Sequence, residues 1–267
     1  MPAGPCLAHS LFSGLRWFLL ACSFAGFFPT AVSGWTPGTQ IAILRDAVRT
    51  LPHPESGYWQ QRLPSLEAGV LEPLRGTAGT EHSVDELGQG ELPRAFRREL
   101  LQALALRLQN ADPEASDRQL GRALHFLNDA NFPLNAGASD LNEGRYFVDF
   151  ARYVDSARPR IVLVERSSQL HLLEAEDFLA LFAKALQRSR EFYPAVAREY
   201  RRIQYGVGRL QFDDRSTAFA VAALSYHHAV ADNREVLLAF RFRNRNMMPN
   251  PLAAFRQEVH VSRKLSN

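Results

Sequence analysis

The sequence predicts an all-α fold, a single multi-helix domain with long loops on one side. Apolar residues recur at helical spacing in several stretches, and prolines stand where these stretches start or stop. No internal repeat or low-complexity tract interrupts them, and no linker divides them. We therefore expect one helical domain over residues 35–267, preceded by a separate segment, residues 1–34.

The first helix is expected at Gln40–Thr50, whose aliphatic residues form one stripe and which the prolines after Leu51 stop. The stretch 55–90 mixes glycines, prolines and polar residues, so we expect an irregular excursion with at most short helices. Its length suggests a functional loop. Pro93 suits the first turn of a helix that continues to Asn110.

After a break at Asp112-Pro113, the next helix should extend from about Ser116 to Asp129. Helical spacing returns at Arg145–Ser156. The β-branched run Arg160–Val164 fits either a short strand or a helix entry, and periodicity does not decide between them.

Two long helices complete the predicted domain. The first covers Glu174–Gln204, with a bend before Pro194, and the second covers Asp213–Phe240 and is rich in alanine.

Residues 1–34 have the order of a secretory signal peptide. One positive charge, Arg16, precedes an apolar run from Trp17 to Phe28, and small residues follow. The run is shorter than the roughly 20 residues that span a bilayer, which argues against a lone transmembrane anchor. A lipoprotein site at Cys22 is disfavoured, because few apolar residues separate it from Arg16. We expect a periplasmic or secreted protein with no transmembrane anchor in the mature chain.

Two cleavage points fit the small residues, one after Ser33 and one after Gly34; the second would make Trp35 the first residue. Both cysteines, Cys6 and Cys22, would be removed, so the mature chain would lack disulfides and thiol nucleophiles. The whole chain carries 31 Lys and Arg against 28 Asp and Glu. This near balance calls for neither a nucleic acid nor an anionic membrane as partner.

His125 and Asp129 stand at i and i+4, so both project from one helix face and could bind one metal ion together. They belong to the stretch Ala123–Asn135, ALHFLNDANFPLN. This stretch resembles the metal-binding helix of the zinc-dependent phospholipase C and single-strand nuclease superfamily. That helix has the order His, aromatic, aliphatic, Gly, Asp, any residue, Asn or His, Gln, Pro, aliphatic, His. Its departures from this order include Asn128, in the place of the Gly, and Asn135, in the place of the last His.

The resemblance implies an all-α phospholipase C/nuclease-like fold and a cleft in which zinc ions activate water for phosphodiester hydrolysis. Matched to the family, the expected metal ligands are His125, Asp129, His82, Glu72 (with Glu67 as second choice) and the amine and carbonyl of a first residue Trp35. Asn131 and Asn135 are expected to contact substrate. The substrate could be a small phosphoester, a lipid headgroup or a nucleotide, and we expect no stable nucleic-acid complex.

The three zinc sites of the family are not equally matched. Gln40, a poor zinc ligand, stands where the N-terminal site has a His. The third site has Asn135 in place of its first His, and only Glu143 could contribute from the next loop. One zinc site is therefore expected, and three are not.

A different interpretation gives the same polar residues a structural role. Gln40, Asn131 and Asn135 could form a buried hydrogen-bonded network in a non-catalytic binding or structural protein that has lost its metals. A single remaining metal site lies between the two interpretations. The discriminating geometry is whether His82 and a Glu converge with His125 and Asp129.

Two further patterns have less specific meanings. His228 and Asp232 repeat the helical spacing of a metal pair, but a polar helix face explains them more simply. The basic run Arg241–Asn246 could contact phosphate or lipid headgroups, although cations at a helix C-terminus are favourable by themselves.

Overall fold

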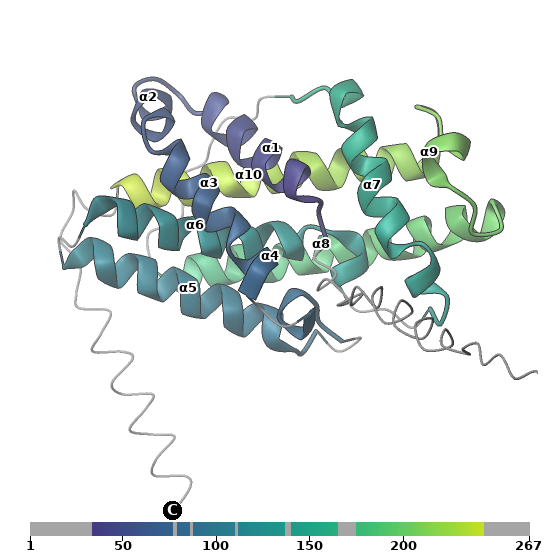
Figure 1. Cartoon of the computed structure of the whole chain (residues 1–267), viewed down its shortest axis with the longest axis horizontal. Coiled ribbons are helices and arrows are strands. Elements are labelled where there is room, and N and C mark those ends of the chain that lie inside the picture. Colours follow the sequence, from purple (N-terminus) through teal and green to yellow (C-terminus); the bar gives the residue numbers. More distant parts are fainter. Residues whose placement is uncertain are drawn as a thin grey trace, which may run out of the picture. The chain divides into compact units, whose positions relative to one another are not determined.

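A computed structural model describes residues 34–76, 79–85, 88–109, 112–136, 140–164 and 175–242. Over these residues the chain forms α-helices and short 3-10 turns, and no strand occurs among them (Figure 1). The predicted all-α fold is confirmed. The described residues all lie within the compact unit Ala31–Asn267. The expected signal peptide, apart from Gly34, lies outside the described residues.

Helix α1 (Pro37–Arg49) begins at a Thr36 cap, whose hydroxyl accepts from the Thr39 N–H at 3.1 Å. Three short helices follow in the stretch that the sequence predicted as irregular: α2 (Glu55–Gln60), α3 (Leu63–Leu71) and α4 (Pro73–Gly76). A 3-10 turn at Gly79–His82 comes next. The excursion thus contains short helices, which the prediction allowed, and one of them, α3, packs against α6 (Pro113–Ala130).

Helices α5 (Glu91–Leu108) and α6 (Pro113–Ala130) lie antiparallel and side by side (Figure 1). The predicted start of α6 at Ser116 is three residues late. Asp112 accepts from the Glu114 N–H at 3.0 Å, and Pro113 takes the first helical position, where its missing N–H costs nothing. The pair that the sequence predicted as a break therefore starts α6, whereas α5 ends earlier, at Leu108.

The second half contains α7 (Phe147–Ala157), α8 (Ala175–Arg202), α9 (Gly208–Gln211) and α10 (Thr217–Phe242). Further 3-10 turns lie at Pro133–Asn135, Glu143–Arg145 and Arg158–Arg160. Residues 161–164 form neither of the two predicted structures. Val164 instead donates its N–H to His227 Nε2 on α10, at 3.1 Å. Helix α8 continues through Pro194.

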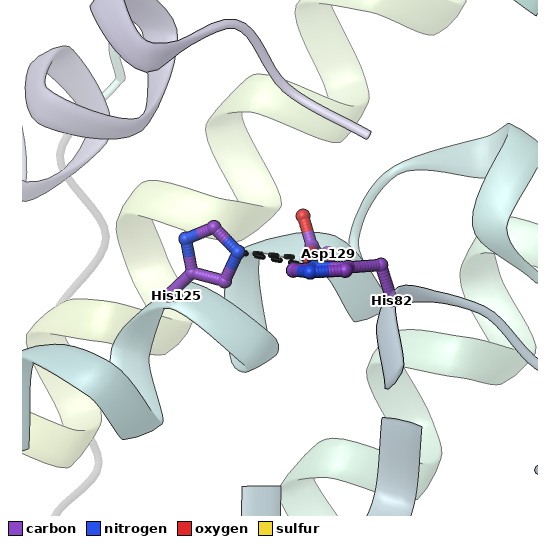
Figure 2. Close-up of side chains that lie close together, drawn as sticks. All are labelled: His82, His125 and Asp129. Carbon is purple, nitrogen blue, oxygen red and sulfur yellow. Dashed lines mark hydrogen bonds and ion pairs between the residues drawn. The ribbon is translucent and has the colours of Figure 1, made fainter. Parts of the chain in front are cut away.

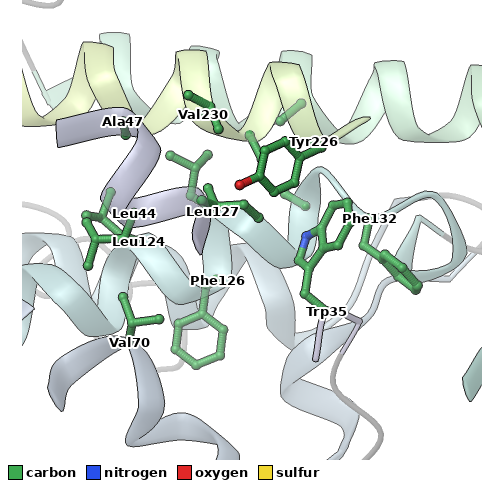
Figure 3. Close-up of a cluster of buried hydrophobic side chains, with 14 of the residues drawn as sticks. Trp35, Leu44, Ala47, Val70, Leu124, Phe126, Leu127, Phe132, Tyr226 and Val230 are labelled. Atoms are coloured by element: carbon green, nitrogen blue, oxygen red, sulfur yellow. The ribbon is translucent and has the colours of Figure 1, made fainter. Parts of the chain in front are cut away.

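Helix α6 lies at the centre of the core, with α1, α3, α8 and α10 packed around it (Figure 3). Its own apolar residues meet side chains from α1, α3 and α10; the cluster contains Leu44, Ala47, Val70, Leu124, Phe126, Leu127 and Val230. The last turns of α6 are buried on all sides, and this includes their polar residues. A polar group in such a place must find its partners inside the protein.

Two glycines allow α3 to cross α6 with backbone against backbone. A Cβ atom on Gly69 would collide with the carbonyl group of Arg118, and one on Gly121 would collide with the carbonyl oxygen of Leu66. Each hypothetical Cβ would also lie 3.0 Å from the Cα of the opposite glycine. This close approach brings the end of α3 within hydrogen-bond reach of the side chains of α6.

None of the described helices combines the length and the apolar character that a bilayer crossing requires.

Candidate metal centre

His82, His125 and Asp129 converge inside the helical core (Figure 2). Helix α6 supplies His125 and Asp129 one turn apart, and the 3-10 turn before α5 supplies His82. His82 Nδ1 lies 2.7 Å from Asp129 Oδ2, and His125 Nε2 lies 3.2 Å from each of these two atoms. All three side chains have no solvent-exposed surface. We call these residues the triad.

The triad matches the donor set and spacing of a zinc site. Ligand atoms at roughly 2.0 to 2.1 Å from a tetrahedral zinc ion lie about 3.3 Å from one another. Both separations that involve His125 fit this edge, and only His82 Nδ1 and Asp129 Oδ2 stand closer, at hydrogen-bond length. Two imidazoles and one carboxylate are also a common zinc donor set.

The orientation of His125 follows from the contact between α3 and α6. Its Nδ1 lies 2.8 Å from the carbonyl oxygen of Val70. A carbonyl oxygen only accepts, so Nδ1 carries a proton there. Nε2 is then the ring nitrogen that faces His82 and Asp129. A backbone carbonyl behind a histidine is the usual means by which proteins orient a metal-binding imidazole.

The pKa values of Asp129 and His82 are shifted in opposite directions, and both shifts favour the charged forms of the two groups. Burial raises the pKa of Asp129, but the charges of and hydrogen bonds with His125 and His82 outweigh it and hold the pKa below its usual value. Burial lowers the pKa of His82, but its hydrogen bond with Asp129 and the charge of that group raise it above its usual value. Without a metal, His82 Nδ1–H donates to Asp129. A bound cation would displace this proton.

Amide and indole groups surround the triad. Gln40 Nε2 donates to Asp129 Oδ1 at 3.1 Å, and Asn135 Nδ2 donates to the carbonyl oxygen of Asp129 at 3.3 Å. The indole N–H of Trp35 donates to the carbonyl oxygen of Asn128 at 2.6 Å. These neighbours are fully or almost fully buried. The triad and these neighbours therefore form one connected group of buried polar side chains within the apolar core.

The other predicted ligands lie elsewhere. Glu72 forms ion pairs with Arg118 at 3.1 Å and Arg122 at 3.5 Å, and the second choice, Glu67, pairs with Arg45. Neither belongs to the group of side chains that could hold a metal ion among the described residues. Trp35 reaches the site through its indole, which also packs edge-on against Phe132.

The expected substrate contacts, Asn131 and Asn135, have only 2% and 1% of their surface exposed. Asn131 donates to Asp232 Oδ2 at 2.9 Å and accepts from Arg188 at 3.2 Å. Gln40 and Asn135 thus hydrogen-bond to Asp129, whereas Asn131 belongs to a different set of hydrogen bonds. Glu143 hydrogen-bonds to Tyr193, and burial raises the pKa of its carboxyl group.

Asp232 belongs to a second buried cluster. Its carboxylate accepts from Asn131 and pairs with Arg188, which extends from α8. Burial raises the pKa of Asp232 to about 6, although Arg188 and Asn131 oppose this rise. His228 stacks on Phe192 instead. Nothing in the sequence marks Arg188, because it stands among other charged residues of α8.

Substitutions of Trp35 test how the residues just before α1 are held against the site. The Trp35→Phe variant keeps the ring beside Phe132 and loses one buried hydrogen bond, so its free energy of unfolding should fall by about 1 kcal/mol. Trp35→Ala also loses the buried ring and should cost about 3 to 5 kcal/mol. Urea unfolding measures both. Equal losses in the two variants would contradict the dominant role of ring packing.

No protein-family model and no curated protein matches the sequence. Among solved structures, the fold is similar to that of Clostridium perfringens alpha-toxin isolated from the avian strain SWCP, with a TM-score of 0.53 and 13% sequence identity. The match covers 79% of this chain and 64% of the toxin chain, so this chain spans somewhat less than two thirds of the toxin. At this identity the likeness concerns the fold alone. The all-α, phospholipase C-like fold of this chain is built around a buried His-His-Asp group that could bind a metal ion.

Proposed function

We propose that the protein binds one zinc ion through His82, His125 and Asp129, and that this ion serves the helical scaffold as a structural cofactor. One observation carries the proposal: three donor atoms of a buried triad lie 2.7 to 3.2 Å apart and face a common point. His125 is held for this purpose by the Val70 carbonyl, and Asp129 is held by Gln40. An ion at this point would link the turn before α5 to the centre of α6.

Burial favours the structural role over catalysis. A phosphoester must reach a catalytic ion, whereas the three side chains have no exposed surface. A surface groove of about 630 Å³ lies over α1, α2 and α3, and its lining residues include none of the triad. Asn131 and Asn135, the expected substrate contacts, are occupied by hydrogen bonds inside the protein.

Phosphoester hydrolysis is the second candidate, and one specific observation favours it. The triad provides three protein ligands, the number typical of catalytic zinc sites, on a fold with a phospholipase C-like architecture. Zinc in such a site lowers the pKa of water and neutralises charge on phosphoryl oxygens. In this chain His82, His125 and Asp129 would hold the ion, and the His82 proton would leave as the ion binds. Both candidate functions include an export signal in residues 1–34 and a mature chain that begins at Gly34 or Trp35.

The zinc content of the purified mature protein tests the proposal. We expect close to one zinc per chain in protein prepared without chelator, measured by inductively coupled plasma mass spectrometry. A His125→Ala, Asp129→Ala double variant should contain none, while the control His53→Ala, at an exposed loop position, should match the unmodified protein. Absence of zinc from the unmodified protein, with added zinc failing to raise its Tm, would overturn the proposal.

Two further readouts separate the structural role from the catalytic one. For a structural ion, chelation should lower the Tm, since a ligand at 100 times its Kd stabilises the folded state by about 2.7 kcal/mol. The zinc-loaded protein should then not hydrolyse bis(p-nitrophenyl) phosphate. Hydrolysis that disappears in the double variant and persists in His53→Ala would support the second candidate instead.

A further inference from the structure

A row of side-chain amides connects α10, α6 and α1 to the carboxylate of Asp129. Asn233 Nδ2 on α10 donates to Asn128 Oδ1 on α6 at 2.6 Å, and Asn128 Nδ2 donates to Gln40 Oε1 on α1 at 2.7 Å. Gln40 Nε2 then donates to Asp129 Oδ1 at 3.1 Å. All four side chains have no exposed surface or only a trace of it. We call Asn233, Asn128 and Gln40 the amide chain.

The direction of the amide chain is fixed at its two ends. Asn233 Nδ2 also donates to the carbonyl oxygen of Ala229, at 2.8 Å, and the other end of the chain meets a carboxylate oxygen. Both of these end groups accept hydrogen bonds and donate none. If the amides were reversed, oxygen would face oxygen at both ends. Each NH₂ group therefore points along the chain towards Asp129, and successive bonds polarise one another in the same sense.

The amide chain divides the two oxygens of Asp129 between different partners. Oδ1 accepts from Gln40, and Oδ2 faces His82 and His125. The carboxylate can rotate only by breaking the bond with Gln40. Oδ2 is thus presented to the point where the triad converges, and Oδ1 is already occupied by a neutral donor.

Gln40 and Asn128 are also two of the positions where this chain departs from the metal-binding pattern that it resembles. They are 88 residues apart in sequence and bond to each other at 2.7 Å. A buried amide without a partner costs roughly 1 to 3 kcal/mol. Gln40 and Asn128 therefore supply each other with the hydrogen-bond partner that a buried amide needs. This pairing indicates that the residues of the amide chain act together.

We propose that Gln40, Asn128 and Asn233 are positioning residues that reserve Oδ1 of Asp129 for the protein and present Oδ2 to one cation. The part of this inference that concerns a cation rests on the proposed zinc site. The amide chain makes Asp129 a ligand through one oxygen and leaves no carboxylate oxygen for a second ion. It also couples zinc affinity to Asn233, a residue that does not touch the triad.

Zinc affinities of single and double variants test the positioning role. We expect Gln40→Ala and Asn233→Ala each to weaken zinc binding about 10-fold to 100-fold, by competition titration with a chromophoric chelator. The double variant should weaken it by less than the product of the two single effects, because both break the same chain. The control is Ser225→Ala, two turns earlier on α10, whose buried hydroxyl is outside the amide chain and should leave the affinity unchanged. Unchanged affinity in Asn233→Ala, or effects that multiply, would overturn the proposal.

A second readout needs no metal and separates failure of the amide chain from failure of the zinc site. The Gln40 side-chain NH₂ resonances are followed by two-dimensional NMR in chelator-treated protein. In Asn233→Ala they should shift, because the donor chain behind Gln40 is broken, and in Ser225→Ala they should stay in place. If the unmodified protein binds no zinc but these resonances shift, the zinc site fails and the amide chain stands. If it binds zinc and the resonances do not move, the amide chain fails and the zinc site stands.

Discussion

Replacing Gly121 with alanine should lower the free energy of unfolding by about 3 kcal/mol or more. Overpacking a core usually costs about 1 to 3 kcal/mol, and here the added methyl group meets the backbone of Leu66 rather than a side chain that could move aside. Gly69→Ala should have a similar cost, because its Cβ would meet the Arg118 carbonyl. The crossing of α3 and α6 must open in either variant.

Gly57→Ala is the matched control for both changes. Gly57 also lies within a helix, α2, but a Cβ added there would have no atom within 4 Å. Alanine in this place should leave stability unchanged or raise it by up to about 1 kcal/mol through helix propensity. Urea unfolding of the three variants gives the comparison. A Gly121→Ala protein as stable as the Gly57→Ala protein would show that α3 and α6 are not held at backbone contact.

The same crossing should affect the proposed zinc site. If α3 moves away from α6, the carbonyl of Val70 no longer fixes the Nδ1 proton of His125. Zinc affinity should then fall in Gly69→Ala and Gly121→Ala even at temperatures where both proteins remain folded. The usual loss for an orienting partner is about 10-fold to 100-fold.

Much of the fold could be predicted because most helices have a clear local sequence pattern. Apolar spacing located α1, α5, α7 and the long helices, with ends a few residues from those observed. The predicted start of α6 is too late because a proline after an aspartate can either break a helix or start one. Here Asp112 caps α6 by accepting from the Glu114 N–H, and Pro113 is its first residue. The Arg160–Val164 run was undecidable, because its conformation depends on a contact with His227, far along the chain.

The site was predictable in part for the same reason. His125 and Asp129 share a helix face through their spacing alone, and the position of His82 in the preceding loop agreed with the resemblance. The Val70 carbonyl could not be foreseen, because it depends on two glycines that meet across helices. Burial of the triad was equally hidden, since helices from both halves of the chain create it. Because the triad is buried, the proposed function favours a structural zinc ion over a catalytic one.

Arg188→Ala should be the second severe change, with a loss of about 3 to 5 kcal/mol at pH 8. Arg188 pairs with Asp232, whose side chain has only 6% of its surface exposed, and removal of one partner leaves a buried charge uncompensated. The variant also removes a donor to Asn131, which continues directly from the last turn of α6. The control is Arg202→Ala, whose ion pair with Glu199 lies at the surface and is worth at most about 1 kcal/mol.

The pH dependence identifies the mechanism of this loss. Burial raises the pKa of Asp232 to about 6, whereas an unfolded aspartate has a pKa of about 4. The folded state thus holds the proton more tightly, and this group makes the free energy of unfolding fall as pH rises from about 4 to 6. Without Arg188 the pKa rises further, so the fall extends to higher pH. The Arg188→Ala loss should therefore be much smaller at pH 5 than at pH 8.

A second substitution removes the charge and should remove this pH dependence. In Arg188→Ala, Asp232→Asn, the neutral amide occupies the buried position, so most of the stability lost at pH 8 should return. Urea unfolding at pH 5 and pH 8 for the single and double variants measures both effects. An Arg188→Ala loss that is equal at the two pH values and persists in the double variant would mean that packing of the Arg188 side chain, not the charge of Asp232, stabilises the contact between α8 and α10.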